Sequence, residues 1–589
     1  MRQFFKMMFA SALGVFLAAG LLIFIAFSMF VGLLAGMGNT SAYRPANNTV
    51  LKIVLDGSMA DNPTENPLSL LMGDVENVVS LRDVLDAVEI AGQDDRIAGI
   101  YLESGVLSCG TASLEAIRRS LLDFKKSTGK FIVAYADTYS QGNYFLCSVA
   151  DKVFLNPQGT LELVGIASQT MFYKGLLDKI GVDMQIFKVG TYKGAVEPFM
   201  QDKLSEANRE QIQSYISSIW NRIAEGIAES RGVSVETVNR FANDGLSLAD
   251  PMEAVDLGFV DALNYKMEVE DYVKGLAGQS TRNLVSASVS EVKTLRVPSF
   301  NAAPTIAVLY AEGEIEEQAS SSLYDMEACI SEKLVDELIK LKDDDNIYAV
   351  VLRVNSPGGS SYVSDQIWRA VVELRKQKPV VVSMGDVAAS GGYYISCAAN
   401  RIIAEANTLT GSIGVFGIFP DVSGLFGKLD LTTDILKTNT FADIGDFSRP
   451  MNDSEKRLVQ RYVDRVYQTF LARCAEGRGM TTEQIDAIGQ GRVWTGEQAK
   501  EIGLVDELGG IEEAIRVAAE LAAIDQYSVT TIKGSKSFLD EFLEIQWSNI
   551  KVTIVRNFLG DEFERVKAIG RVRTSQGIQA RLPFDMRPL

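Results

Sequence analysis

The stretch Asp344-Asp-Asn-Ile-Tyr-Ala-Val-Val-Leu352 indicates the architecture of this chain, because a second version, Asp94-Asp-Arg-Ile-Ala-Gly-Ile-Tyr-Leu102, stands earlier in the sequence. Both versions lead from two acidic residues into a mainly apolar run, which is typical of a strand buried in a parallel sheet. Three more pairs of blocks match in the same order, about 250 residues apart: Lys52–Gly57 with Ile306–Gly313, Asp137–Cys147 with Asp386–Cys397, and Ala254–Asp261 with Ala499–Asp506. Order and spacing kept over four blocks predict an internal duplication.

The two copies show the same alternation of strands and helices. Ile347–Val354 and Pro379–Met384 predict buried strands, and Ser331–Lys342 has the apolar spacing of a helix. A long amphipathic helix is predicted over Glu455–Ala475, with Glu206–Ser230 as its counterpart in the first copy. This alternation predicts the α/β class, with two similar units of about 230 residues each.

The boundaries follow from where the duplication begins and ends. A chain of 589 residues is too long for a single core. We predict a first half over residues 48–278, a linker over 279–304 and a second half over 305–532. Residues 533–589 have no counterpart in the first half and mix apolar with basic residues, so we expect a tail that packs on another domain or subunit.

The N-terminal segment, residues 1–38, is predicted to be a transmembrane anchor. The stretch Met7–Gly38 carries no charge, and roughly 20 apolar residues are enough to span a bilayer. Arg2 and Lys6 precede it and no acidic residue appears before Asp56, so the positive-inside rule places the N-terminus in the cytoplasm. A cleaved signal peptide is the alternative. An acidic remainder behind such an anchor suggests a bacterial inner membrane, with residues beyond the anchor in the periplasm.

Composition excludes several kinds of protein. The chain has no histidine, which excludes Ser-His-Asp and Cys-His sites and every zinc site that uses histidine. The net charge of −19 argues against a nucleic-acid binder, because phosphate would be repelled. None of the 5 cysteines forms a C-x-x-C pair. We therefore expect no metal and no cofactor.

Two candidate residues are divided between the copies. Ser390 stands in the glycine-rich turn Ala389-Ser-Gly-Gly392, and its position in the first half is occupied by Gln141. Lys193 stands in an apolar segment of the first half, and its position in the second half is occupied by Ala442. Each half thus keeps one member of a possible pair, which a purely structural repeat would not be expected to do.

Serine and lysine together can perform nucleophilic catalysis. A serine hydroxyl needs a base, and lysine is a base only when neutral, which near pH 7 requires a pKa lowered by ~3 units from about 10.4. Burial in an apolar site produces shifts of that size. Backbone N–H groups of Gly391 and of Gly358 or Gly359 would form an oxyanion hole. The alternatives are a surface lysine, a helix N-cap serine and an ordinary Pro-Gly-Gly turn.

The motifs together resemble a known family. The anchor, the duplicated α/β halves, Gly190-Thr-Tyr-Lys193 with Glu197-Pro-Phe199, Asn355-Ser-Pro-Gly-Gly359, Ser390-Gly-Gly and Thr410-Gly-Ser-Ile-Gly414 are similar to the long, duplicated form of the signal peptide peptidase A family, peptidase family S49. The resemblance implies tandem domains of the ClpP/crotonase fold. It also implies a serine endopeptidase that degrades cleaved signal peptides in or beside the membrane and assembles as a homotetramer.

The resemblance assigns roles residue by residue. Ser390 would be the nucleophile, Lys193 the general base, and Ser412 a hydroxyl that orients the lysine amine. Gly391, with Gly358 or Gly359, would form the oxyanion hole. One departure is Gly194, where serine is expected in many relatives.

Two other functions stay open on the sequence alone. A crotonase-type acyl-CoA enzyme uses the same fold and oxyanion hole, but the predicted anchor and Lys193 argue against it. A non-enzymatic membrane scaffold with a degenerate protease fold is the second, and the retention of both Ser390 and Lys193 argues against that.

Overall fold

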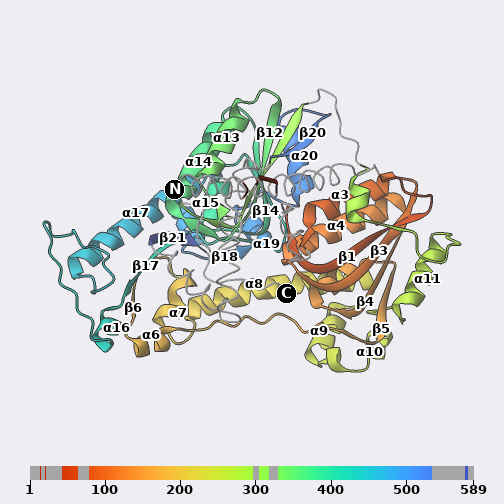
Figure 1. Cartoon of the computed structure of the whole chain (residues 1–589), viewed down its shortest axis with the longest axis horizontal. Helices are drawn as coiled ribbons and strands as arrows, with labels where there is room; N and C mark the ends of the chain where they lie inside the picture. The colour runs from red at the N-terminus through yellow and green to blue at the C-terminus, as the bar shows by residue number, and fades with distance from the viewer. Residues whose placement is uncertain are drawn as a thin grey trace, which may run out of the picture.

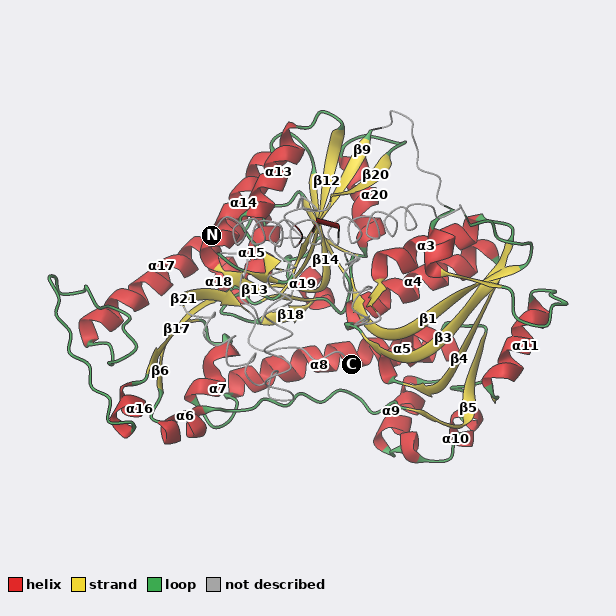
Figure 2. Ribbon diagram, viewed as in Figure 1, coloured by secondary structure: helices red, strands yellow, loops and turns green. Residues whose placement is uncertain are grey.

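The computed structural model describes residues 43–63, 78–295, 304–317, 329–532 and 577–581, with residues 14, 20 and 21 nearer the N-terminus. Two α/β units lie side by side (Figure 1). Helices cover the sheets of both units (Figure 2). The predicted α/β class is therefore confirmed.

The first unit is built on a parallel sheet of 7 strands. Its strands run in the order β2-β1-β3-β4-β5-β7, with β8 pairing β1. The strand bounds are Thr49–Ala60 for β1, Val78–Ser80 for β2, Ile97–Ser108 for β3, Phe131–Tyr139 for β4, Lys152–Leu161 for β5, Ala262–Leu263 for β7 and Ser286–Ser288 for β8. The helices over it are α3 (Leu81–Gln93), α4 (Thr111–Thr128), α5 (Gln141–Cys147), α8 (Glu206–Arg231), α9 (Val235–Asn243), α10 (Met252–Asp256) and α11 (Lys266–Leu276).

The second unit repeats this arrangement. Its sheet of 8 strands has the order β18-β16-β14-β12-β9-β20, with β15 pairing β14 and β19 pairing β15. The bounds are Thr305–Glu312 for β9, Ile347–Ser356 for β12, Val380–Ala389 for β14, Arg401–Ala404 for β15, Leu409–Gly411 for β16, Val493–Thr495 for β18, Glu507–Leu508 for β19 and Ser528–Ile532 for β20. The helices are α13 (Lys333–Asp343), α14 (Ser361–Arg375), α15 (Gly391–Ser396), α17 (Asp453–Arg478), α18 (Thr482–Ile488), α19 (Gly496–Glu501) and α20 (Ile511–Leu521).

The repeat extends to single hydrogen bonds. The Tyr144 hydroxyl of α5 donates to the carbonyl of Phe259, and the Tyr393 hydroxyl of α15 donates to the carbonyl of Leu504. Both tyrosines are fully buried, since their rings fill the space between the sheet and the helices of their own half. The two halves therefore share a fold and an equivalent buried hydrogen bond that stabilises it.

A third sheet joins the two halves. Its order is β11-β10-β13-β21-β17-β6. Strand β6 (Asp183–Val189) comes from the first half and pairs antiparallel with β17 (Val415–Asp421) of the second half over its full length. The others are β10 (Glu314–Ile315), β11 (Cys329–Ile330), β13 (Gly358–Ser360) and β21 (Gly577–Arg581). This sheet carries a segment of the first half onto the second.

Buried ion pairs also hold the halves together. Arg353, in β12, donates two hydrogen bonds of 2.9 Å to Asp61, which follows β1. At the end of β14, Asp386 accepts hydrogen bonds from the backbone N–H and the hydroxyl of Ser113 in α4, at 3.0 and 2.6 Å. Arg119 of α4 binds Glu405 in two places. Asp61, Arg353 and Glu405 are buried, and each has its partner in the other half, so these contacts fix the halves relative to each other.

Three sequence predictions fall at the ends of the halves. Nearly all of the predicted anchor lies outside the described residues, and within those residues no helix has the length and apolarity needed to cross a bilayer. Part of the segment predicted as a linker is folded, because β8 pairs with β1 and α12 (Val289–Lys293) follows it. Within the predicted tail, β21 pairs with strands of the second half.

Candidate active site

Ser390 lies in the turn between β14 and α15. Its φ and ψ are 55° and −113°, a conformation that side-chain-bearing residues rarely adopt. The turn is held because the Ser390 N–H donates to the carbonyl of Gly411 at 2.8 Å, while the Ser390 carbonyl accepts from the N–H of Tyr394. Strained residues of this kind cluster at functional sites, so the backbone supports a functional role for this serine.

Lys193 reaches this serine from the other half of the chain. It follows β6, whose last residue, Val189, pairs with Val415 at the start of β17. Lys193 Nζ lies 2.9 Å from Ser390 Oγ, 3.0 Å from Ser412 Oγ and 3.2 Å from the Ser412 carbonyl oxygen. The structure thus brings together the three side chains that the sequence analysis selected.

The amine of Lys193 has no charged partner at this site. The side chain is fully buried, and its polar contacts among the described residues are two hydroxyls and one carbonyl. The ring of Phe416 lies 5.9 Å from Nζ. Burial lowers the pKa of Lys193 well below its ordinary value, because an unpaired ammonium loses its hydration there. The neutral amine is the form that can accept a proton.

Two residues that the sequence analysis missed position this lysine. Gly491 has a φ of +79°, and a Cβ added there would lie 2.7 Å from Lys193 Cβ. Gln211, in α8, donates from Nε2 to the Tyr192 carbonyl at 2.8 Å and accepts from the Val493 N–H at 3.1 Å. A polar residue on the buried face of α8 was the available signal for Gln211, whereas Gly491 carried none.

The three predicted oxyanion-hole glycines converge beside Ser390. A Cβ on Gly391 would lie 3.0 Å from Gly358 Cα and 3.1 Å from Gly359 N, so the two backbones touch. Gly391 opens α15, where N–H groups have no acceptor within the helix. The Gly358 N–H already donates to Ser356 Oγ at 3.2 Å. The Gly358 N–H is thus already used by Ser356, whereas the Gly391 N–H is placed to hold an oxyanion.

The corresponding position in the first half is closed. Gln141 Oε1 accepts hydrogen bonds from the backbone N–H groups of Gly165 at 2.9 Å and Val164 at 3.2 Å. Ala442, at the position that corresponds to Lys193, is exposed on a loop of the second half. At the repeated positions, the first half therefore lacks the nucleophile and the second half lacks the base.

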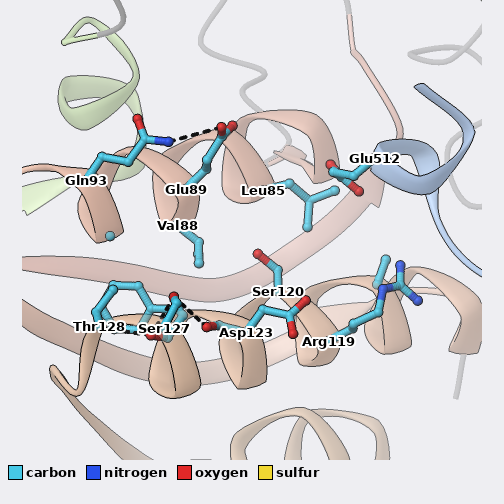
Figure 3. A pocket seen from close by; sticks show the side chains of 13 residues that line it. Leu85, Val88, Glu89, Gln93, Arg119, Ser120, Asp123, Ser127, Thr128 and Glu512 are labelled. Carbon is cyan, nitrogen blue, oxygen red and sulfur yellow. Dashed lines mark hydrogen bonds between the residues drawn. The ribbon is translucent and has the colours of Figure 1, made fainter. Parts of the chain in front are cut away.

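Metal ligands are not grouped in the described part of the chain, where no three acidic or cysteine residues lie so as to hold an ion. Cys109, Cys147, Cys397 and Cys474 are buried thiols that form no disulfide. A separate groove of about 430 Å³ lies between α3 and α4, lined by residues such as Leu85, Arg119 and Glu512 (Figure 3). None of the three clustered side chains lines it.

Comparisons with known proteins agree with this geometry. The family model for peptidase family S49 matches residues 124–280 and 372–525, one stretch in each half, and the Clp protease model matches residues 318–409. Protease 4 of Salmonella typhi is 35% identical over 89% of this chain and 86% of its own length. Serine protease SPPA of Arabidopsis thaliana, a chloroplast protein, is 31% identical over 92% and 78%.

A shorter relative matches part of the chain. The putative signal peptide peptidase SppA of Enterococcus faecium is 32% identical over 42% of this chain and 74% of its own length. The two S49 matches together cover more than half of the sequence, and they fall on the two repeated units. The chain therefore belongs to peptidase family S49, and it is a serine protease.

Proposed function

We propose that this protein is a membrane-anchored endopeptidase that uses Ser390 and Lys193 as a catalytic dyad to degrade cleaved signal peptides in or beside the membrane. The observation that carries the dyad is the 2.9 Å contact between Lys193 Nζ and Ser390 Oγ inside a fully buried site. A neutral lysine at that distance is within reach of the hydroxyl proton. Ser412 supports the assignment, because its two oxygens fix the direction of the amine.

The proposed mechanism follows from this geometry. Neutral Lys193 takes the hydroxyl proton as Ser390 Oγ attacks the substrate carbonyl, and the oxyanion is held by the N–H groups of Gly391 and Gly359. The ammonium of Lys193 then protonates the leaving amine as the peptide bond breaks. Water then attacks the resulting ester and gives a proton to Lys193, which passes it to Ser390 Oγ as the ester C–O bond breaks, and the free serine and the neutral lysine are regenerated. In the proposed mechanism, Lys193 thus accepts and donates every proton that is transferred.

The substrate and the location are inferred from the sequence and one relative. The Enterococcus faecium relative is named as a putative signal peptide peptidase. The uncharged stretch Met7–Gly38 would hold the enzyme in the bilayer where apolar signal peptides remain after their release. With the N-terminus in the cytoplasm, both halves would lie in the bacterial periplasm.

Copies of the chain are proposed to assemble head to tail. The repeat aligns Lys188 with Lys437, so Phe187 of β6 corresponds to Leu436 in the loop over residues 431–449, here called the outer loop. Phe187 is 6% exposed against β17, whereas Leu436 is 95% exposed. Residues 162–172 of the first half correspond to β17. They have no strand partner among the described residues and run to α6 (Lys174–Ile180) along the lower edge of Figure 2.

Because the two halves are repeats, the outer loop and residues 162–172 correspond to β6 and β17, two strands that pair with each other within the chain. The outer loop of one copy would pair with residues 162–172 of the next, as β6 pairs with β17 within a copy. An interface between unlike surfaces forms a ring when its rotation closes. The family resemblance sets the expected ring at four copies.

The proposed dyad is tested by replacing its members one at a time. Ser390→Ala and Lys193→Met should each lower kcat on a fluorogenic apolar peptide by at least about 1000-fold, because neither half offers a replacement. Lys203→Ala, which removes an exposed lysine of the same region, is the matched control and should keep full activity. Turnover by Lys193→Met at the wild-type rate, with circular dichroism unchanged, would show that another group is the base.

A further inference from the structure

A buried carboxylate, Glu197, stands four residues after Lys193 and takes no part in the proposed proton transfers. It begins α7 (Glu197–Met200), which lies at the N-terminal end of α8 (Figure 2), and it is 1% exposed. Three donors satisfy it: the Ser205 N–H at 3.1 Å, the Ser205 hydroxyl at 2.6 Å and the Asn208 amide at 3.1 Å. A buried carboxylate with these donors is held firmly, so it can fix the segments that it joins.

Asn208 extends these contacts toward the lysine. It lies buried in the first turn of α8, where its Nδ2 donates to Glu197 and its Oδ1 accepts from Gln211 Nε2 at 2.6 Å. Gln211 also donates to the carbonyl of Tyr192, the residue before Lys193, at 2.8 Å. A chain of hydrogen bonds therefore runs from Glu197 to the backbone that carries the lysine, and its members strengthen one another in a buried site.

The side chain of Asn208 also fills the space beside Gly194, the residue after Lys193. A Cβ added to Gly194 would lie 2.4 Å from Asn208 Nδ2 and 2.7 Å from Asn208 Oδ1. Gly194 begins the short 3₁₀ helix Gly194–Val196, whose backbone angles suit residues with side chains. Asn208, held by its own hydrogen bonds, is therefore what excludes a side chain here. Glycine at position 194, where serine was expected, is matched by asparagine at position 208.

We propose that Asn208 is a positioning residue for the catalytic base, and that Gly194 and Asn208 form a matched pair. The inference deepens the proposed function and rests on it, because Lys193 must be the base. Asn208 packs on Gly194 after the lysine, and through Gln211 it holds the Tyr192 carbonyl before it. An ion pair would keep the amine charged. A base that works as a neutral amine is therefore better positioned through its backbone, as this arrangement does.

A serine at position 194 would be able to replace the amide of Asn208. A hydroxyl donates one hydrogen bond and accepts others, so it matches the donor and acceptor of the amide. With Asn208 shortened to alanine, the hydroxyl would lie close to the positions that Nδ2 and Oδ1 now occupy. It would then donate to Glu197 and accept from Gln211, which restores the chain of hydrogen bonds.

Single substitutions provide the first test. Asn208→Ala breaks the chain of hydrogen bonds, and Gly194→Ser forces two side chains into one space. Each should lower kcat, and the rate at which a fluorophosphonate labels Ser390, by about 10- to 100-fold with KM changed less than about 2-fold, because a base displaced by ~1 Å costs a rate of that order. Gln213→Ala removes an exposed amide of α8 and is the control that should keep both rates.

The double variant separates positioning from a general loss of structure. Gly194→Ser with Asn208→Ala should recover kcat to within roughly 3-fold of wild type, because the two changes compensate each other and are not additive. Gly194→Ser removes no hydrogen-bonding group, so its loss and its rescue can be measured even if Asn208→Ala lowers the melting temperature. Additive losses in the double variant would overturn the proposal.

Two further outcomes would also reject the positioning role. One is a wild-type kcat in Asn208→Ala, and the other is a loss confined to KM. Both are read beside Ser390→Ala and Lys193→Met. If those two variants are inactive while Asn208→Ala keeps the wild-type kcat, the dyad stands and only the positioning role fails. If Lys193→Met itself keeps its activity, the proposed function fails first.

Discussion

Among the described residues, the buried amine of Lys193 has no acidic partner, and this determines how activity should depend on pH. Its contacts with Ser390 and Ser412 are to neutral groups, so burial favours the neutral amine. As the pH rises through the lowered pKa of Lys193, the base form appears. We expect kcat/KM to rise along a limb whose midpoint lies well below the ordinary lysine value. A limb at about 10.4 would indicate a solvated lysine.

The same lysine makes a prediction about stability. Because its pKa is lowered on folding, the unfolded chain binds more protons between the folded and unfolded values. Unfolding free energy should therefore increase with pH across that window. Lys193→Met should remove this slope and raise the melting temperature at neutral pH, as measured by differential scanning calorimetry at pH 6 to 9. A lower melting temperature in the variant would contradict the burial argument.

Gly491 tests how closely the base must be placed. Alanine at this position would put Cβ within 2.7 Å of Lys193 Cβ, in a backbone region that disfavours side chains. A displacement of ~1 Å can lower a rate by about 100-fold, so Gly491→Ala should reduce kcat by that order with little change in KM. Gly479→Ala is the control, because it has a φ of +66° but open space around it. Equal activity of the two variants would mean that the lysine tolerates the shift.

At single positions, the residues proposed to react were easier to predict than the residues that position them. Lys193 and Ser390 were identified because the repeat replaced each in the other half, and the structure brings them together. The sequence could not separate Gly358 from Gly359, since this depends on where the Ser356 hydroxyl points. In the sequence, Gln211 could be recognised only as a polar residue on a buried helix face. The fold is needed to show that it donates to the Tyr192 carbonyl.

Helices and strands with strong periodicity were predicted well. Ile347–Val354 is found as β12 and Pro379–Met384 as part of β14, while the two long helices are α17 and α8. By contrast, the pairing of β6 with β17 was not predicted, because it joins strands from different halves and leaves no local pattern. Such pairing is decided by packing between units rather than by the period of either strand.

The ends of β12 and β14 carry a buried charge cluster that fixes the two halves. Arg353 is paired with Asp61, and burial together with Asp61 raises the pKa of nearby Glu312 to about 7. Arg353→Met would leave these carboxylates and Asp386 without a cation, at a cost of about 3–5 kcal/mol. Urea unfolding should show the loss. It should be larger at pH 8 than at pH 5, because Glu312, whose pKa is about 7, is protonated at pH 5 and then needs no counter-charge.

Asp61→Asn in the Arg353→Met background provides the comparison. Removing the principal partner charge as well should recover part of the lost stability, which a double-mutant cycle measures. Strict additivity of the two changes would mean that the side chains do not interact.

Within the chain, β6 of the first half and β17 of the second half form a junction. The repeat counterparts of these strands, the outer loop and residues 162–172, would form the same junction between two copies. Figure 1 shows the outer loop projecting beyond α17, away from the first half. Leu436→Asp should therefore dissociate the proposed ring into smaller species in light scattering, because it places a charge where the repeat puts Phe187. Leu248→Asp, at a residue 92% exposed elsewhere, should leave the mass unchanged. Equal masses for wild type and Leu436→Asp would exclude this junction.

The division of the proposed dyad between the halves also determines when a newly made chain can become proteolytically active. Lys193 leaves the ribosome 197 residues before Ser390, so a chain arrested between them holds a proton acceptor with nothing to activate. A fragment of the second half alone holds a hydroxyl that nothing deprotonates. Proteolysis therefore begins only after synthesis has passed both halves and they have docked. Truncated translation products that lack either residue are therefore expected to have no proteolytic activity.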